Sequence, residues 1–401
     1  MLDQQTLQES MVTSACCGGM KLPPLKYDTV HKFVEDLAGE VLHPKQVDSL
    51  AHSVVGAIHA DTASITAIGR AAAWAREVSE KHSIKQVDRL LANSKVDAFA
   101  VMQHVVPQLV SGRSRIVVAV DWTEFASNGH STVAVSMITE HGRATPLMWL
   151  TVASKKLKKR RSQFEDRVLW QLRLAVPEHV HVTVLADRGF ADTGLFWTLK
   201  EKMRFDYVIR FKAGTFVESA DGDARPAGEW VPPNGQAKRL PMPLMTRKRR
   251  SVPAVVCVKR AGMKEAWCLV TSLADATSED VVQLYSCRFD IEHTFRDQKD
   301  WRFGLALDHM TLGTPGRRDR MLLVLALATM FSVIVGAAGE QLGLDRLLRA
   351  NTETRKRTHS LLRQGHEYMT GVARAVIADL RRTFLVLWRD LRATDRIYAL
   401  L

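Results

Sequence analysis

Cysteine is scarce in this 401-residue chain, which has five cysteines, an odd number without the spacing of a disulfide framework. Cys16 and Cys17 are adjacent, and no Cys-x-x-Cys pair or His-x-x-x-His cluster indicates a structural zinc site. The N-terminal residues also lack the basic and then apolar order of a signal peptide. These absences favour a protein of a reducing, cytoplasmic compartment.

Acidic residues are outnumbered, with 43 Asp and Glu against 56 Lys and Arg, which gives a formal net charge of +13. The sequence pI is near 9.7. We therefore expect a polyanionic partner, with nucleic acid ahead of an anionic membrane. With 46% hydrophobic residues, the chain is long enough for two or three domains and a large core.

One segment without charge, residues 321–339, is long enough to span a membrane. Arg317, Arg318 and Arg320 precede it and would suit the positive-inside rule. Burial is favoured, because this would be the only span and the chain on both sides has the pattern of a soluble protein. A helix that is apolar all round can equally be a central core helix. We predict a core helix and no membrane association.

Changes in periodicity and composition divide the chain into predicted regions. They are a flexible tail (1–26), an all-helical DNA-binding domain (27–112), the first part of an α/β core (113–213), a β-rich insertion (214–273), the second part of the core (274–340) and C-terminal helices (341–401). Within the helical domain, residues 83–91 predict a short capped helix. Its Lys85 and Arg89 lie one turn apart and could dock on a DNA groove or backbone. An ordinary charged surface helix is the alternative.

Two aspartates follow predicted buried strands. The β-branched run 116–120 carries Asp121 at its carboxyl end, and strand 180–186 presents Asp187 in the same way. The other predicted elements of this region are strands 132–138, 146–152 and 207–211 and helices 162–176 and 192–203. This order is that of a ribonuclease-H-like α/β fold, in which the first strand is central and the fourth lies beside it. The two carboxylates can then converge, since neighbouring strands lie roughly 4.8 Å apart.

A helix is predicted for residues 281–299, because a capping box at Thr277 and Asp280 precedes an apolar run without Gly or Pro. At about 100° per residue, four of its polar side chains would form one stripe within roughly 60°. The stripe consists of Tyr285, Arg288, Glu292 and Lys299. A plain solvated face with surface ion pairs is the alternative.

Asp121, Asp187 and Glu292 together would make a site of hard oxygen ligands suited to Mg²⁺ or Mn²⁺. Two such ions, about 4 Å apart, would serve an in-line phosphoryl displacement. The two cations of the stripe would then contact phosphates, and its tyrosine could donate to a phosphate or stack on a base. Each aspartate alone could instead be a turn residue or a helix cap. Residues 155–161 hold six cations in seven positions, either as a solvated loop or as a phosphate clamp.

The sequence resembles the DDE transposases of bacterial insertion sequences, in the insertion-sequence-four family, from about residue 83 to about residue 351. Its specific element is the Tyr-x2-Arg-x3-Glu-x6-Lys signature, which the stripe on residues 281–299 matches without a gap. Val118-Ala119-Val120-Asp121 is similar to the motif of the first catalytic aspartate. Asp187-Arg188-Gly189-Phe190 is similar to that of the second.

The resemblance implies an enzyme of the bacterial nucleoid that binds the inverted terminal repeats of its element and pairs them as a homodimer. It implies nicking, formation and opening of a DNA hairpin on the transposon end, and joining of the 3′ ends to target DNA. In such enzymes a flipped base stacks on a tryptophan, and Trp267 matches that position. Trp230 is the second candidate, and Trp267 as an ordinary core residue is the alternative. The chain is short for relatives with a separate dimerising C-terminal domain, so the dimer interface is not predicted.

Two other functions stay open on the residues alone. One is a metal-dependent nuclease or resolvase of the same fold, which cuts without joining. The other is a catalytically silent DNA-binding regulator, which nothing favours because all three carboxylates are present.

Overall fold

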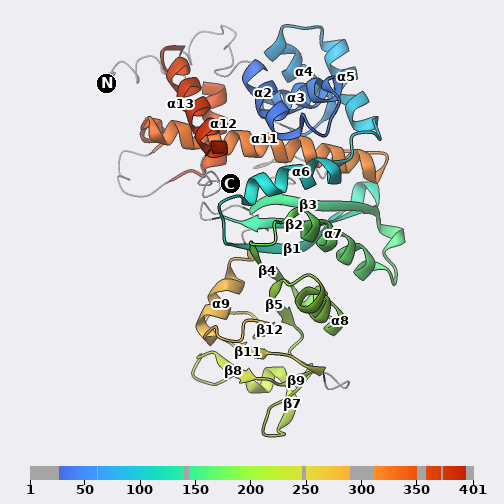
Figure 1. Cartoon of the computed structure of the whole chain (residues 1–401), viewed down its shortest axis with the longest axis vertical. Coiled ribbons are helices and arrows are strands. Elements are labelled where there is room, and N and C mark those ends of the chain that lie inside the picture. Colours follow the sequence, from blue (N-terminus) through green and yellow to red (C-terminus); the bar gives the residue numbers. More distant parts are fainter. Residues whose placement is uncertain are drawn as a thin grey trace.

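The computed structural model of the chain describes residues 27–60, 62–139, 144–245, 250–289, 310–349, 358–371 and 374–393. Figure 1 shows a long sheet with helices gathered at one end and the strands of the predicted insertion at the other.

The N-terminal part of the described chain is all helical. Its helices are α2 (Tyr27–Ala38), α3 (Pro44–His59), α4 (Ile65–Arg76), α5 (Glu80–Ala92) and α6 (Ala98–Val110). His43 with Gln46 forms a capping box at α3, while Ser64 caps α4 and Asp97 caps α6. Their apolar faces are buried, as the predicted stripe residue Phe33 illustrates. The helical character predicted for residues 27–112 is confirmed.

A mixed sheet follows, and it includes strands from two predicted regions. Its strands are β1 (Arg115–Phe125), β2 (His130–Ile138), β3 (Ala144–Ala153), β4 (His181–Ala186), β5 (Asp206–Phe211), β8 (Lys238–Pro241), β11 (Ala254–Val258) and β12 (Trp267–Thr271). They are ordered β3-β2-β1-β4-β5-β12-β11-β8. β1 is antiparallel to β2 and parallel to β4, as predicted for the first and fourth strands. This sheet is compatible with a ribonuclease-H-like domain.

The region 214–273 is β-rich as predicted, and three of its strands, β8, β11 and β12, extend the central sheet. A second sheet has the order β10-β9-β6-β7. Its strands are β6 (Phe216–Glu218), β7 (Ala224–Pro226), β9 (Leu244–Met245) and β10 (Arg250–Ser251). The insertion is therefore continuous with the core through β5 and β12.

Helices flank the central sheet. α7 (Arg161–Ala175) packs against β2 and β3, and α9 (Ser278–Ser286) packs against β5, β11 and β12. α8 (Thr193–Trp197) continues as a π-helical turn over Thr198–Lys202, so the helix predicted for residues 192–203 is present with a change in its hydrogen bonding. Short 3-10 turns occupy Ala126–Asn128, Ser154–Lys156, Arg188–Phe190, Ala227–Trp230 and Leu344–Leu348.

α11 (Pro315–Gln341) is the long core helix and packs against α3, α5, β3, α12 (Leu361–Gly371) and α13 (Arg374–Ala393) (Figure 1). It is long and apolar enough to cross a membrane, but 94% of its most apolar window is buried inside the protein. The predicted core helix is confirmed. Of the three arginines before the apolar segment, Arg318 packs inside the protein, where its buried guanidinium lies 3.8 Å from the Phe125 ring centre.

The prediction of one continuous helix over residues 281–299 is wrong, because residues 287–288 form a turn. α9 begins at the predicted capping box of Thr277 and Asp280 but ends at Ser286. The Ser286 hydroxyl donates to the carbonyl of Gln283 at 2.6 Å, and the Cys287 N–H bonds Leu284 instead. Such side-chain competition for a helix carbonyl bends or ends helices. Residues 290–309, with Glu292 and Lys299, lie outside the described residues.

Candidate active site

The two predicted aspartates occupy neighbouring positions at the ends of parallel strands. Val120 of β1 pairs with Ala186 of β4, so Asp121 and Asp187 come directly after the last paired residues. Side chains alternate along a strand. Ala119 and Leu185 belong to the cluster that packs on α9, which places both aspartates on that face of the sheet.

Asp187 is held by the backbone that follows it. Its Oδ1 accepts the N–H of Gly189 at 2.8 Å, which caps the short 3-10 turn Arg188–Phe190. A Cβ atom at Gly189 would lie only 3.0 Å from that oxygen, so glycine leaves room for the contact. The cap predicted as an alternative role for this aspartate is therefore present, and it also fixes the direction of the carboxylate.

Each carboxylate oxygen of Asp121 has a neighbouring donor. The backbone N–H of Trp122 donates to Oδ1 at 2.8 Å, and an Arg288 guanidinium nitrogen lies 3.4 Å from Oδ2. Arg288 is only 7% exposed. The structure thus brings the arginine of the predicted stripe to the first aspartate, although α9 ends two residues before it.

Tyr285 lies next to Arg288 but is closed off from solvent, with 1% of its surface exposed. Burial raises the pKa of its hydroxyl, while Arg288 and Arg210 oppose that shift. Its ring meets the Trp267 ring edge to face, with 5.1 Å between centres. In this conformation the tyrosine supports its neighbours, and its ring is not available for stacking on a base.

The two tryptophans proposed for stacking differ in their surroundings. Trp267 begins β12, is partly exposed, and lies 5.9 Å from Phe289, itself 37% exposed. Trp230 is 5% exposed and donates through Nε1 to the carbonyl of Val217 at 3.3 Å. Of the two, Trp267 is the more exposed residue.

The sequence reasoning missed a buried carboxylate beside the aspartates. Glu165 of α7 is 6% exposed and accepts the Trp122 indole N–H at 2.7 Å. Burial raises the pKa of Glu165, and the Trp122 hydrogen bond and Arg161 oppose the shift. The signal in the sequence was its spacing, since Glu165 shares the inward face of the helix with Val168 and Leu169 at three and four residues.

The chemistry of the two aspartates suits a divalent cation. Asp121 and Asp187 offer only carboxylate oxygens, which Mg²⁺ prefers. Over the described part of the chain, no three His, Cys, Asp or Glu side chains are grouped closely enough to hold a metal ion. The predicted third ligand, Glu292, is outside the described residues.

A family comparison identifies what kind of protein this is. Residues 112–331, more than half of the chain, match the model of the transposase DDE domain. The protein belongs to this family. The predicted resemblance to DDE transposases is thereby confirmed, and the protein is a transposase whose substrate is DNA. Enzymes of this kind generally use divalent metal ions. No curated protein matches the chain.

The transposase carries its other predicted DNA-binding residues on α5, outside the matched segment. Lys85 and Arg89 are both exposed there. Between them, Asp88 forms an ion pair with Arg317 at the start of α11. This pair directs one side of α5 to the core helix and leaves the two cations facing solvent.

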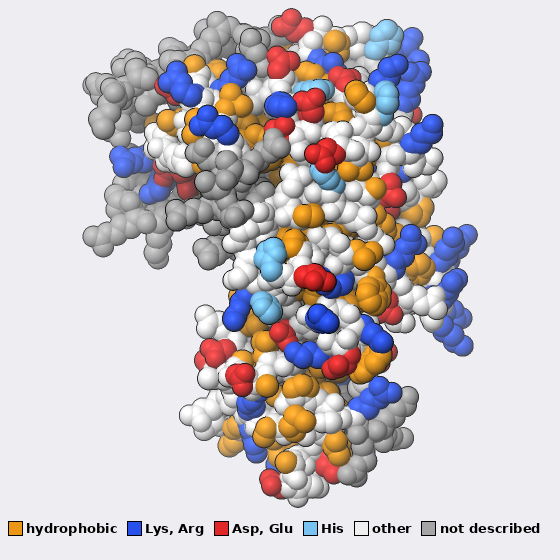
Figure 2. Space-filling model, viewed as in Figure 1, with side chains coloured by type: hydrophobic (Ala, Val, Ile, Leu, Met, Phe, Trp, Pro, Cys, Tyr) orange, Lys and Arg blue, Asp and Glu red, His pale blue; other side chains and the backbone are white. Residues whose placement is uncertain are grey.

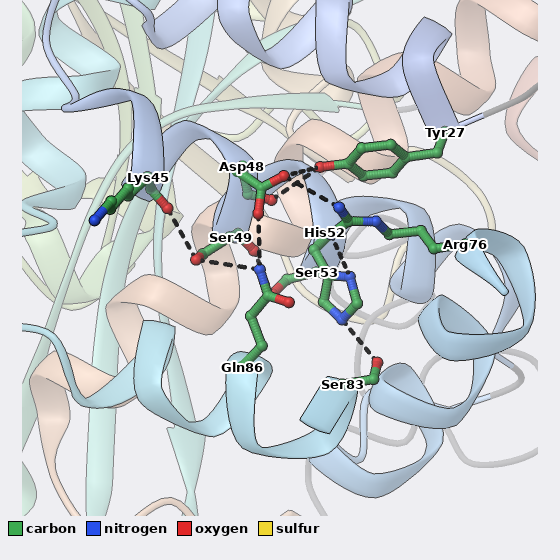
Figure 3. Close-up of polar contacts among 9 residues, drawn as sticks. All are labelled: Tyr27, Lys45, Asp48, Ser49, His52, Ser53, Arg76, Ser83 and Gln86. Carbon is green, nitrogen blue, oxygen red and sulfur yellow. Dashed lines mark hydrogen bonds and ion pairs between the residues drawn. The ribbon is translucent and has the colours of Figure 1, made fainter. Parts of the chain in front are cut away.

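A polar network holds α5 against α3 and α4 (Figure 3). Asp48 accepts hydrogen bonds from the Tyr27 hydroxyl at 2.6 Å and from Gln86 at 3.0 Å. His52 Nε2 lies 2.7 Å from the Ser83 hydroxyl, and its Nδ1 lies 3.1 Å from Arg76. The candidate DNA-binding helix is therefore held against α3 and α4 by polar contacts, of which the His52–Ser83 contact is buried.

The direction of this hydrogen-bond chain follows from its last link. Ser83 donates its single hydroxyl hydrogen to the carbonyl of Gly69 at 2.5 Å, so it must accept from His52 Nε2–H. Nδ1 is then left as the acceptor for Arg76. Burial and the Arg76 charge lower the pKa of His52 to about 4. The histidine is neutral at physiological pH.

Proposed function

We propose that this transposase mobilises a bacterial insertion sequence of the insertion-sequence-four family by a cut-and-paste route. It binds the terminal inverted repeats, nicks the DNA, forms and reopens a hairpin on the transposon end, and joins the 3′ ends to target DNA. The observation that carries the proposal is the register of β1 and β4, which sets Asp121 beside Asp187 on the face that Arg288 approaches. The unbroken Tyr-x2-Arg-x3-Glu-x6-Lys spacing supports it.

The proposed catalytic residues are Asp121, Asp187 and Glu292, which would hold two Mg²⁺ or Mn²⁺ ions. When bound, such ions activate the attacking oxygen and stabilise the leaving oxygen of phosphoryl transfer. Arg288 holds the Asp121 carboxylate, and with Lys299 it would contact the phosphates of the cut strand.

For the hairpin step, Trp267 is the proposed stacking partner of a flipped base. Its edge-to-face contact with Tyr285 orients the indole at the start of β12, and its outer part is accessible. Stacking of this kind contributes about 1–3 kcal/mol and offsets part of the cost of unpairing.

The helical region 27–112 is the proposed end-binding domain, with Lys85 and Arg89 on its contact surface. Pairing of two ends requires a homodimer in the DNA complex, which would act in the nucleoid of the cytoplasm. The remaining proposed division is a catalytic core at 113–213 and 274–340, interrupted by the insertion at 214–273 and followed by C-terminal helices.

The deciding experiment incubates the protein and Mg²⁺ with a linear duplex that carries the inverted repeats flanking the coding region. Hairpinned ends and strand-transfer products are expected. Cut products alone would instead show a nuclease, and shifted but intact DNA a binding protein. Asp121→Asn, Asp187→Asn and Glu292→Ala should each abolish nicking while end binding persists. Nicking retained by one variant would remove that residue from the site.

A further inference from the structure

The segment between β3 and α7 carries a dense positive charge that the proposed function does not yet use. Its exposed cations are Lys155, Lys156, Lys158, Lys159, Arg160 and Arg161. Figure 2 shows Lys and Arg side chains gathered along one edge of the molecule at the level of the sheet. Among the described residues, the ion pairs with acidic side chains include only Arg161 from this segment.

The segment has a defined shape, because it is fastened at its start and turned by backbone hydrogen bonds. The Ser154 N–H donates to the carbonyl of Gly129 at 2.8 Å, and the Ser154 and Ser131 hydroxyls lie 2.8 Å apart. Within the segment, Arg160 N–H donates to the carbonyl of Leu157 at 2.9 Å. Lys159 takes the left-handed conformation, with φ at 60°, that reverses the chain. The backbone of the segment therefore needs little reordering on binding, and the remaining entropic cost is that of fixing the exposed lysine side chains.

Its far end is anchored next to the candidate active site. The Arg161 guanidinium lies over the Trp122 ring, 4.8 Å from its centre, and 3.6 Å from the Glu165 carboxylate. Glu165 in turn accepts the Trp122 indole N–H, and the Trp122 backbone N–H donates to Asp121. The basic segment is thus linked through Arg161 and Glu165 to Trp122, whose indole lies on the other face of β1 from Asp121 and whose backbone N–H reaches that aspartate.

We propose that residues 155–160 bind the phosphate backbone of the DNA duplex beside the cut strand, with Arg161, Glu165 and Trp122 fixing the segment against β1. Lysines contact phosphates without reading sequence, so this surface would serve any duplex that enters the site. The inference rests on the proposed function and adds to it the surface on which the duplex lies.

The test compares two four-lysine variants of the full-length protein. One is K155Q/K156Q/K158Q/K159Q. The matched control, K202Q/K212Q/K259Q/K264Q, removes the same charge from exposed positions elsewhere. For a duplex without terminal repeats, the first variant should bind at least about tenfold more weakly at 0.15 M salt. Its plot of log affinity against log salt should be shallower by roughly 2 to 3.5, because each phosphate that a cation neutralises adds about 0.9 to the slope.

The position of the segment on the DNA is tested by ethylating single phosphates of a duplex that carries the transposon end. Within about one helical turn of the nick, ethylation of some phosphates should weaken wild-type binding and leave binding by the segment variant unchanged. Ethylation of the phosphates that Arg288 or Lys299 would contact should weaken binding by both proteins. Equal slopes for segment and control variants, or the same interference pattern for wild type and segment variant, would overturn the proposal. If wild type binds DNA with the expected slope but neither nicks nor joins it, the proposed function fails and the surface assignment stands.

Discussion

At the scale of single residues, the two oxygens of the Asp121 carboxylate are held by different neighbours. Trp122 N–H fixes one oxygen and the nearly buried Arg288 approaches the other. A guanidinium in such surroundings keeps its charge and offers charge-assisted hydrogen bonds. Arg288 therefore offsets the negative charge that gathers where β1 and β4 end.

Trp267 gives a prediction at this scale. Trp267→Ala should spare the first nick and reduce hairpin yield by about tenfold or more, because the flipped base loses its stacking surface. Trp267→Phe should restore part of the yield. Product analysis on end-bearing duplexes measures both steps.

Trp230→Ala is the matched control for that experiment. Trp230 is buried under Arg225 and Lys238, so its removal should lower the free energy of unfolding by about 3–5 kcal/mol without a specific hairpin defect. A normal hairpin yield from Trp267→Ala would return Trp267 to a core role.

Residue types and spacing were enough to predict that Asp121 and Asp187 follow the paired residues of neighbouring strands, because β-branched runs before them define buried strands. They were not enough for Glu165. A glutamate on a helix is usually solvated, so its spacing to Val168 and Leu169 is only a weak signal, and the tertiary contact with the Trp122 indole establishes that this one is buried. Pairwise contacts between distant elements leave no local pattern in a sequence.

At the scale of elements, the α5 network ties stability to pH through His52. Its folded-state pKa of about 4 lies below the usual 6.5, so the unfolded chain binds a proton first as pH falls. The stabilisation is complete above pH 6.5 and is lost as pH falls toward 4. The contribution of His52 to the free energy of unfolding should therefore reach up to about 3 kcal/mol at neutral pH.

His52→Ala should lower the free energy of unfolding at pH 7 by about 2–4 kcal/mol, since Arg76 and Ser83 lose a buried partner. Its stability should then fall less steeply between pH 6.5 and 4 than that of wild type. Urea unfolding at several pH values measures both effects. The exposed His82→Ala on α5 is the control, and equal pH slopes for wild type and His52→Ala would contradict the assignment.

The packing of α11 on α12 gives a second prediction for elements. A Cβ atom at Gly365 would lie 1.8 Å from the carbonyl oxygen of Ser332, so the helices must move apart to admit it. Gly365→Ala should therefore destabilise the protein by about 3 kcal/mol or more despite the better helix propensity of alanine. Gly313→Ala, with open space around its Cβ position, should change stability by less than about 1 kcal/mol. Thermal unfolding of the two variants checks the contrast.

Elements were predictable where one pattern dominated the sequence. The strands β1 to β5 and the core helix α11 follow from periodicity, and the place of β4 beside β1 follows from the ribonuclease-H-like order of the elements. The end of α9 was not predictable, because Gly and Pro are absent there and the break comes from the Ser286 hydroxyl taking a helix carbonyl. The addition of three insertion strands to the central sheet was not predictable either, because it depends on pairing between distant parts of the chain.

At the scale of the whole molecule, the start of α11 joins the N-terminal helices to the sheet. Arg320 Nε donates to the carbonyl of Leu91, near the end of α5, at 2.6 Å. Asp319 accepts the backbone N–H of Thr151 in β3 at 2.9 Å. Arg320, which the sequence suggested as a membrane flank, and its neighbour Asp319 thus connect the proposed end-binding region to the catalytic fold.

Asp319 makes this junction sensitive to pH. Burial raises its pKa from 3.8 to about 7, while the Thr151 hydrogen bonds oppose the shift. Between about pH 4 and 7 the folded protein holds a proton that the unfolded chain has released, so stability should decrease as pH rises through this window.

Asp319→Asn should remove that dependence, because the amide oxygen can still accept from Thr151 and no charge is buried. At pH 8 the variant should be more stable than wild type by between about 1 and 4 kcal/mol, and near pH 4 the two should be nearly equal. Urea unfolding from pH 4 to 8 measures the difference. Asp88→Asn, which removes an exposed ion pair of the same junction, should cost less than about 1 kcal/mol at neutral pH. A less stable Asp319→Asn at pH 8 would mean that Asp319 is ionised in the folded state and that its charge stabilises the junction through Arg320.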